Sequence, residues 1–484
     1  MAGFHRSEEY VSSPADLRLL PFTFERLAAD RYIVANVVGD LMTVSADELE
    51  KLSRLELRAG DGLFERAFEK MLIATNGQQS QLQLLALRMR SRMGFLRQIT
   101  PLHIFVVSLR CEHACPYCQV SRQSSDRAAF DMDEVTAFKA LDVAFCAPSP
   151  TIKIEFQGGE PLLNFELIRL MVPEAERRAR EAGKQVAFVI TTNFALLTDE
   201  ILAFCKAHDI LLSTSLDGPE DLHNKNRPRP GNNSHQLTER GIRRAQELLG
   251  RDHVGALMTT TERSLGRVRE IVDEYVRLGL DGIFLRPLSP YGFAIKTKQY
   301  QKYGGEVWLN FYKEGLTYIL ELNKAGRHFP EYYASLLLRR LLTDRPIGYV
   351  DLRSPAGIGL GALVYNYDGA VFASDEGRML AEMGDRTFEL GQLSTDSYED
   401  LILSDKLVSM VGDSLTQCAP QCVSCVFESH CGADPVYHHA TQSNSLGIKP
   451  LSDFCGRQKG VLTHLLNLLE NSPEDAAILR RWAS

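Results

Sequence analysis

The sequence has no long apolar run, no excess of positive charge and no targeting segment. None of its apolar runs approaches the ~18 to 20 residues that a membrane-spanning helix needs. The first residues, MAGFHRSEEYVSS, have neither the apolar core of a secretory signal nor the Arg-rich face of a transit peptide. A net charge of -8 and a pI near 5.9 argue against a large nucleic-acid footprint. We therefore expect a cytoplasmic protein without nucleic-acid or membrane partners.

Cysteine is the residue type that is unusually placed. Of ten cysteines, three lie between positions 111 and 118 and five between 418 and 455, while Cys146 and Cys205 stand alone. In a reducing cytosol, closely spaced cysteines bind metal more often than they form disulfides. We expect Cys146 and Cys205, which sit beside apolar neighbours in helical stretches, to be buried packing residues.

Apolar segments that read as strands alternate with helical segments through the middle of the chain. The helices have recognisable starts, such as Asp131 with Glu134, and Thr198. Strands that alternate with helices imply parallel βαβ units, which right-handed crossovers wind into a partial or complete barrel with its chemistry at the carboxyl ends of the strands. The predicted strands are 102–108, 152–156, 186–191, 211–216, 254–260 and 281–286.

Three cysteines directly follow the first predicted strand of this barrel: Cys111, Cys115 and Cys118. Three thiolates can hold three irons of a four-iron cluster and leave the fourth iron open to a non-protein ligand. Zinc is the competing metal, with His113 as the only convincing fourth ligand nearby.

The spacing C-x3-C-x2-C, with Tyr117 before the last cysteine, resembles the signature of the radical S-adenosylmethionine (SAM) enzymes. Two further stretches resemble their SAM-binding motifs, FQGGEP after the second strand and STSLDGPEDLHNKNRP after the fourth. The resemblance implies that SAM binds the open iron and that one-electron cleavage yields a 5'-deoxyadenosyl radical, which abstracts a substrate hydrogen. The cofactor-binding residues that it implies are Tyr117, Gln157, Gly158, Gly159, Glu160, Ser215 and Arg227.

The second group of cysteines resembles the SPASM extension of peptide-modifying radical SAM enzymes. The resemblance implies one auxiliary four-iron cluster on Cys422, Cys425, Cys431 and Cys455, although a zinc ribbon also suits this set. Typical SPASM domains hold a second auxiliary cluster, but this chain has Ala356, Ser374 and Asp434 at or beside the expected ligand positions. We expect that cluster to be absent, and Cys418 remains a spare thiol.

A carboxylate beside these positions is the candidate catalytic residue. In sulfatase-maturing relatives, an aspartate after the corresponding cysteine accepts a proton near SAM, and Asp375 occupies that position in ASDEGRM. The alternative is that Asp375 and Glu376 form an ordinary solvated loop.

The N-terminal hundred residues lack the barrel pattern. Two strands around Gly39-Asp40, followed by a helix with a capping box of Ser45 and Glu48, predict a small α+β unit. This unit resembles leader-peptide recognition elements, which capture a peptide by strand addition, but a plain structural appendage is equally compatible.

The sequence therefore predicts an α/β protein, a partial (β/α)6 TIM-like radical SAM barrel between a small α+β unit and a cysteine-rich SPASM-like domain. The boundaries that we expect are 1–100 for the N-terminal unit, 101–300 for the radical SAM core, 301–350 for a helical connector and 351–484 for the C-terminal domain.

Over nearly the whole chain, strings such as FERLAADRYIVANVVGD and YNYDGAVFASDEGRMLAEMGD most resemble the B-type radical SAM maturase of the His-Xaa-Ser system. This implies an oxidoreductase-type enzyme that modifies, by cross-linking, side chains of a ribosomally made peptide or protein. Its partners would be that precursor and a reductant such as flavodoxin or ferredoxin. An iron-sulfur electron-transfer protein and an inert peptide-binding scaffold remain as alternatives.

Overall fold

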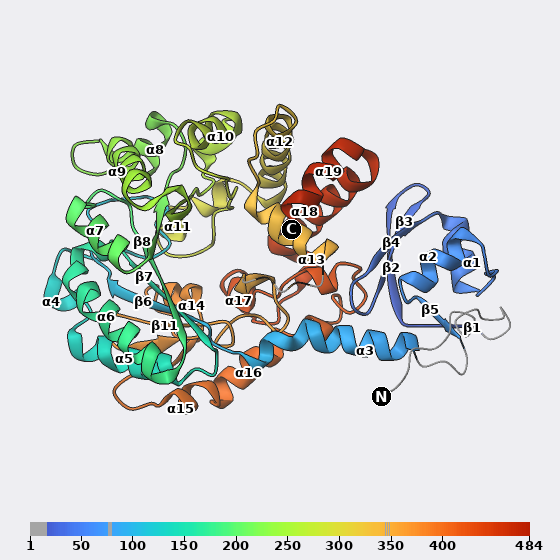
Figure 1. Ribbon diagram of the computed structural model, residues 1–484, viewed down its shortest axis with the longest axis horizontal. Helices are drawn as coiled ribbons and strands as arrows, with labels where there is room; N and C mark the ends of the chain where they lie inside the picture. Colours follow the sequence, from blue (N-terminus) through green and yellow to red (C-terminus); the bar gives the residue numbers. More distant parts are fainter. Residues whose placement is uncertain (1–16, 76–79, 344, 346, 348) are drawn as a thin grey trace.

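The N-terminal part of the chain forms a small unit of strands and two helices, at the right of Figure 1. The computed structural model describes residues 17–75, 80–343, 345, 347 and 349–484. Strands β2, β3 and β4 form an antiparallel sheet, and β1 pairs with β5. The predicted capping box is confirmed, since Ser45 and Glu48 cap α1 reciprocally. The bounds are β1 Leu17–Leu19, β2 Phe22–Ala28, β3 Arg31–Asn36, β4 Leu41–Val44, α1 Ala46–Ser53, α2 Gly62–Glu69 and β5 Ile73–Thr75.

A single helix, α3 (Ser80–Arg92), leads from this unit to the centre of the molecule (Figure 1). The unit has its own apolar core, in which Val34, Leu52 and Ile73 are almost fully buried. Its sheet also contacts helix α18 (Asp453–Asn471) near the end of the chain, because Lys459 Nζ lies 2.6 Å from Glu25 Oε1.

The centre of the protein is an eight-stranded, mostly parallel sheet in the order β10-β9-β8-β7-β6-β11-β12-β13. All pairs from β10 to β11 are parallel, and β12 and β13 complete one edge in antiparallel fashion. The buried aromatic side chains Phe105 and Phe156 pack together in the core of this sheet. The strands are β6 Leu102–Ser108, β7 Thr151–Gly158, β8 Gln185–Thr191, β9 Ile210–Ser215, β10 Val254–Leu257, β11 Ala362–Tyr365, β12 Ala370–Phe372 and β13 Glu389–Gln392.

Helices connect the parallel strands, as the sequence predicts. Thr198 caps α7, as expected, but α5 begins after Asp133 and not at Asp131. Asp133 accepts a hydrogen bond from the Thr136 amide, whereas the Asp131 carboxylate binds Arg110. The helices are α4 Arg127–Phe130, α5 Glu134–Cys146, α6 Phe165–Ala182, α7 Asp199–Ala207, α8 Glu220–Asn226, α9 Ser234–Leu249 and α10 Val268–Arg277.

The sixth predicted strand, 281–286, is wrong. In this segment the Ile283 amide binds the carbonyl of Pro330, and Ile283 forms only an isolated bridge with Glu331. Ile283 thus pairs with residues 330–332, and only the Arg286 carbonyl, which accepts from the Thr260 amide at 2.9 Å, bonds the segment that follows β10. In the described chain, no sixth strand therefore follows β10 in the sheet. A strand from much later in the chain, β11, instead extends the sheet beyond β6.

The prediction of buried lone cysteines is half right. Cys205 is fully buried in α7, whereas Cys146, the last residue of α5, is exposed.

Apart from β11–β13, the chain after α10 is mainly helical, and helices α13, α17 and α18 lie between the sheet and the N-terminal unit (Figure 1). No helix within the described residues is long and apolar enough to cross a membrane. The helices are α11 Phe293–Lys296, α12 Gly305–Lys324, α13 Tyr332–Leu342, α14 Asp375–Ala381, α15 Tyr398–Ile402, α16 Asp405–Asp413, α17 Pro435–Gln442, α18 Asp453–Asn471 and α19 Pro473–Trp482.

Candidate active site

The loop that follows β6 carries the first three cysteines and is anchored at its start. Arg110, which precedes Cys111, donates to both carboxylate oxygens of Asp131 at 2.7 and 2.6 Å and to the Leu163 carbonyl at 2.8 Å. Further along, the Cys118 carbonyl accepts a hydrogen bond from the Phe293 amide at 2.7 Å. The loop is therefore held at both ends by elements that lie far away in the sequence.

The thiols of this loop are free and lie close enough to affect one another. Burial raises the pKa of Cys111 and raises that of Cys115 to about 12. The charge of Cys115 adds to the increase at Cys111, and the charge of Cys118 adds to the increase at Cys115. Arg227 acts in the opposite direction on Cys115. Three unoxidised thiols on one short loop beside a cation fit a metal that displaces their protons, such as a three-cysteine iron-sulfur cluster.

His113 does not supply a free nitrogen for zinc. Its Nδ1 lies 2.9 Å from the Asn193 amide nitrogen and 3.1 Å from Glu112, and its Nε2 lies 2.7 Å from Ser234 Oγ. Both ring nitrogens of His113 thus have protein partners. To act as the fourth ligand of a structural zinc site, His113 would have to lose one of these contacts.

Two glycines let the end of β7 approach this loop. A Cβ on Gly158 would lie 2.0 Å from the Ser108 carbonyl oxygen, and a Cβ on Gly159 would lie 2.3 Å from that of Arg110. The Gly159 and Glu160 amides donate to these two carbonyls at 2.8 and 2.7 Å. Glycine at these two positions therefore allows the end of β7 to lie against the backbone of residues 108–110, which leads into the cysteine loop.

The two polar side chains around these glycines differ in their partners. The Glu160 carboxylate is fully buried and accepts hydrogen bonds from Thr192 Oγ1 at 2.6 Å and from the Asn193 amide at 2.9 Å. Burial raises the pKa of Glu160 to about 7, and the nearby Glu112 adds to the shift. Gln157, in contrast, has a buried Nε2 with no hydrogen-bond partner among the described residues. An orphaned buried donor beside the thiol loop fits a site that receives a polar ligand.

A buried aspartate joins Tyr117 to Arg227. The Asp217 carboxylate accepts hydrogen bonds from Tyr117 Oη at 2.5 Å, Arg227 Nε at 3.2 Å and Arg227 Nη2 at 3.3 Å. The Arg227 guanidinium also lies 5.4 Å from the centre of the Tyr117 ring. Asp217 was not among the predicted site residues, although the motif that contains Ser215 and Arg227 also contains it. Ser215 is the last residue of β9, two positions before Asp217.

Asp375 lies at the start of α14, the helix that Ser374 caps by accepting a hydrogen bond from the Gly377 amide at 3.1 Å. Arg378 Nε lies 2.9 Å from Asp375 Oδ1, and both side chains are largely buried, at 1% and 15% exposure. Burial raises the pKa of Glu155, and the charge of Asp375 contributes to the shift. Asp375 is therefore not a solvated loop residue, and it lies near Glu155, two positions before Gln157 on the same face of β7.

Glu155 is a second residue that the sequence did not single out. A glutamate in the middle of the apolar strand IKIEF was the available signal. Thr191 donates to its carboxylate at 2.9 Å from the neighbouring strand β8.

The second group of cysteines is also brought together as free thiols. Burial raises the pKa of Cys431, and Cys455, Cys425 and Cys422 each add to that shift. Burial also raises the pKa of Cys422, Cys425 and Cys455, and the positive charge of Lys449, of Lys459 or of both opposes this increase at each thiol. Cys418 is exposed and contributes to none of these shifts. Four neighbouring thiols suit a four-iron cluster. Among the described residues, no three of them lie within 4.8 Å of one another, so they do not form the closer arrangement of tetrahedral zinc.

The three positions without cysteine have other structural uses. Ser374 caps α14, and Asp434 caps α17 by accepting a hydrogen bond from the Tyr437 amide at 2.8 Å. Ala356 is buried, and its amide binds Ser414 Oγ. Each of these three positions thus has a structural role that needs no metal.

The cysteine loop lies within a segment that is similar to known proteins. Residues 105–275 match the family model of the Radical SAM superfamily. The chain is 37% identical over 117 residues to an uncharacterized protein of Methanocaldococcus jannaschii, which covers 24% of this chain and 38% of that protein. It is 26% identical over 207 residues to the serine-type anaerobic sulfatase-maturating enzyme of Klebsiella aerogenes, covering 41% of this chain and 50% of the enzyme. These matches thus span half or less of both relatives.

Two solved structures share the fold at low identity. Native anSMEcpe with bound AdoMet superposes with a TM-score of 0.62 at 18% identity, covering 77% of this chain and all of that one. Streptococcus suis SuiB bound to its precursor peptide SuiA gives a TM-score of 0.53 at 15% identity, covering 88% and 97%. Residues 105–275, which include the cysteine loop, thus resemble a radical SAM domain. The similar proteins include a sulfatase-maturating enzyme and the radical SAM cyclopropyl synthase TigE of Paramaledivibacter caminithermalis, 25% identical over 172 residues.

Proposed function

We propose that this protein is a radical SAM maturase that cross-links side chains of a ribosomally made peptide or protein, as the B-type maturase of the His-Xaa-Ser system is expected to do. The observation that carries the proposal is the convergence of three free thiols, the orphaned Gln157 amide and the Arg227–Asp217 pair at the carboxyl ends of neighbouring parallel strands. An electron-transfer protein would have no use for the last two features.

Cys111, Cys115 and Cys118 would hold a four-iron cluster, and Gln157, the Gly158–Glu160 backbone, Ser215 and Arg227 would hold SAM. When bound, these cofactors supply the 5'-deoxyadenosyl radical that removes a hydrogen atom from the substrate. Asp217 binds the Nε and Nη2 atoms of Arg227. The remaining guanidinium nitrogen, Nη1, would donate to the carboxylate of SAM. Tyr117 would fix the position of Asp217, and the buried loop would keep water away.

Cys422, Cys425, Cys431 and Cys455 would hold one auxiliary four-iron cluster in a SPASM-like domain over 351–484. A cytoplasmic flavodoxin or ferredoxin would reduce the enzyme. The core would extend over 101–300, with a connector at 301–350, and the unit within 1–100 would bind the leader of the precursor.

Asp375 would take the proton that a modified side chain releases. Arg378 holds the Asp375 carboxylate in a defined, largely buried position. Glu155 lies nearby and could receive the proton from Asp375.

The test is co-expression of the chain with small proteins encoded beside its gene, followed by mass spectrometry. The proposal expects a precursor whose mass falls by a hydrogen pair for each cross-link. Asp375→Asn should lower this modification by roughly two to four orders of magnitude, the range for loss of a positioned acid or base. Deoxyadenosine formed without peptide should stay near the wild-type level.

Ser374→Ala is the matched control, because it removes the helix cap and keeps the carboxylate. It should cost about 1 kcal/mol of stability and leave the modification in place. Normal modification by Asp375→Asn would remove Asp375 from the mechanism.

A further inference from the structure

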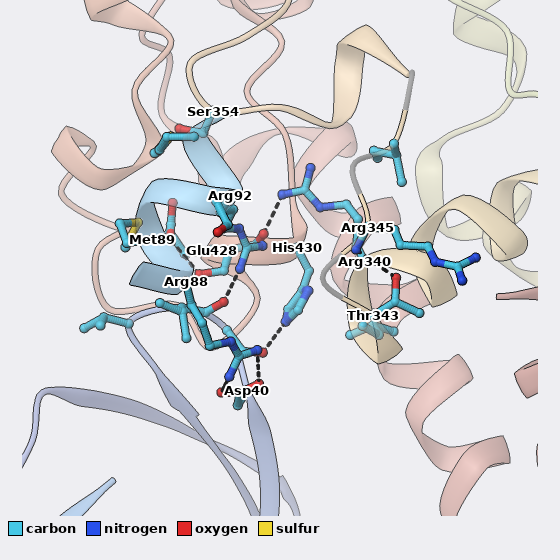
Figure 2. A pocket seen from close by; sticks show the side chains of 18 of the residues that line it. Asp40, Arg88, Met89, Arg92, Arg340, Thr343, Arg345, Ser354, Glu428 and His430 are labelled. Carbon is cyan, nitrogen blue, oxygen red and sulfur yellow. Dashed lines mark hydrogen bonds and ion pairs between the residues drawn. The ribbon is translucent and has the colours of Figure 1, made fainter. Parts of the chain in front are cut away.

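A cavity lies away from the cysteine loop, where the N-terminal unit meets the C-terminal third. It has a volume of about 350 Å³, at the lower end of the range of ligand pockets, ~300 to 1,000 Å³. Side chains from the β3–β4 turn, from α3, from the end of α13 and from residues 428–430 surround it (Figure 2).

The charge of this cavity is opposite to that of the chain as a whole. The described residues that line it include seven basic side chains and two carboxylates, in a chain with a net charge of -8. The two carboxylates are already engaged: Arg88 binds Asp40, and Glu428 accepts hydrogen bonds from Gln417 and Thr416. The basic residues are Lys70, Arg88, Arg92, Arg340, Arg345, Arg353 and Arg480.

Two partly buried arginines of this set, Arg340 and Arg353, have no carboxylate partner within the part of the chain that the structure describes. Arg340 donates one hydrogen bond, to the Ser429 carbonyl at 2.5 Å, and its buried Nε has no partner. Arg353 donates to the Ile347 carbonyl at 3.2 Å and stacks 5.0 Å from the ring of Phe95. Burial lowers the pKa of Arg340 to about 9, and the positive charges of Arg92 and Arg353 contribute. The positive side chains that line the cavity repel the charge of Arg340. A bound anion would relieve this repulsion and accept the unused hydrogen bonds of the arginines.

We propose that this cavity binds an acidic segment of the peptide or protein substrate, with Arg340 and Arg353 as the carboxylate-binding residues. The inference rests on the proposed function for the identity of the occupant. Guanidinium forks match carboxylates in geometry, and the volume exceeds what a single small anion fills. Binding here would tether the substrate at a distance from the chemistry and raise its effective concentration at the reaction site.

The test is fluorescence anisotropy with a fluorescein-labelled hexaglutamate peptide and the full chain, at low ionic strength and without SAM. We expect saturable binding that the double variant Arg340→Gln/Arg353→Gln weakens roughly tenfold or more, as the loss of charge-assisted hydrogen bonds implies. The double variant Arg243→Gln/Arg244→Gln removes the same charge from the exposed face of α9 and should bind like the wild type.

A second pair of variants keeps every arginine, in case the first double variant misfolds. Val37 is 41% exposed and lines the cavity, so Val37→Glu adds a competing carboxylate while Val37→Gln adds the same bulk without charge. Binding should be weaker for Val37→Glu than for Val37→Gln.

Equal binding by all variants would overturn the proposal. The proposal would also be overturned if the cavity bound inorganic phosphate but not hexaglutamate. Phosphate binding would be seen as a phosphate-dependent rise in melting temperature that is lost in Arg340→Gln/Arg353→Gln. Deoxyadenosine formation by the same preparations reports the proposed function separately, so either idea can fail alone.

Discussion

Asp217 holds the guanidinium of Arg227 along one edge, with its two carboxylate oxygens 3.2 Å from Nε and 3.3 Å from Nη2. Asp217 is fully buried and also anchors Tyr117, the residue before the third cysteine of the loop. Burial works against the charged form of Arg227, but Asp217, together with Tyr117 and Cys115, raises the pKa of the arginine above its usual value. The orientation of Arg227 beside the cysteine loop therefore depends on an aspartate.

Asp217→Asn should weaken SAM binding. The amide keeps the shape of the carboxylate but loses the charge that orients Arg227, and a charge-assisted hydrogen bond is worth ~1.5 to 3 kcal/mol, or roughly ten- to a hundredfold in affinity. Equilibrium dialysis of SAM against reconstituted protein of equal iron content measures this. Asp221→Asn, an exposed carboxylate paired with Arg267, is the control and should bind SAM normally. Unchanged affinity in Asp217→Asn would show that the pair has no part in the SAM site.

Iron content should report two clusters. Anaerobic reconstitution should give about eight irons per chain, four on each cysteine set. Replacing Cys111, Cys115 and Cys118 together with Ala should leave about four, and so should replacing the four C-terminal thiols. Cys418→Ser should leave about eight, because this exposed thiol does not belong to the C-terminal set. Twelve irons, or zinc at the C-terminal site, would contradict this assignment.

Gly159→Ala should disturb the first cluster without changing any ligand. The added methyl group would lie 2.3 Å from the Arg110 carbonyl oxygen and 2.6 Å from that of Leu109, so the backbone that leads to Cys111 must move. We expect slower and incomplete cluster assembly at the N-terminal set, measured by iron content and visible absorption. Gly255→Ala in β10 has open space around the new methyl group and should load iron normally. Equal loading of the two variants would show that this close approach is unimportant.

Glu274 should make the fold sensitive to acid. Burial alone would raise the pKa of Glu274, but hydrogen bonds from Arg277 at 2.7 Å and His235 at 2.7 Å prevail and bring it to about 2, below the usual 4.5. A lowered folded-state pKa stabilises the protein above pH 4.5, and this contribution is lost as the pH falls toward 2.

In chemical denaturation, Glu274→Gln should cost about 1 to 3 kcal/mol at pH 7, and the difference from wild type should shrink at pH 3. Glu200→Gln, at a carboxylate that is 78% exposed, should show no such trend. A difference for Glu274→Gln that does not change with pH would contradict this explanation.

Much of the fold could be predicted from local patterns. Five of the six predicted strands form, because each is an apolar run that the neighbouring parallel strands bury. The segment 281–286 has the same apolar character, but Ile283 at its centre bonds to residues 330–332, and nothing in the local sequence reveals that partner. For the same reason β11, which lies over 250 positions after β6, could not be foreseen as its neighbour.

The candidate site could also be predicted from the sequence only in part. The spacing of the cysteines and the motifs around Gln157 and Arg227 lie in the sequence itself. The partners of these residues do not: Asp217 under Arg227, Glu155 near Asp375 and Asp131 under Arg110 each come from contacts between separate segments.

The central claim, that the cysteine loop supports SAM cleavage, is tested most directly by incubating the anaerobically reconstituted protein with SAM and dithionite and measuring 5'-deoxyadenosine by chromatography. The account predicts deoxyadenosine from the wild-type protein and none from the Cys111, Cys115 and Cys118 triple alanine variant that still carries the C-terminal metal. Wild-type protein with iron on both cysteine sets that forms no deoxyadenosine, or a triple variant that forms as much as the wild type, would contradict it.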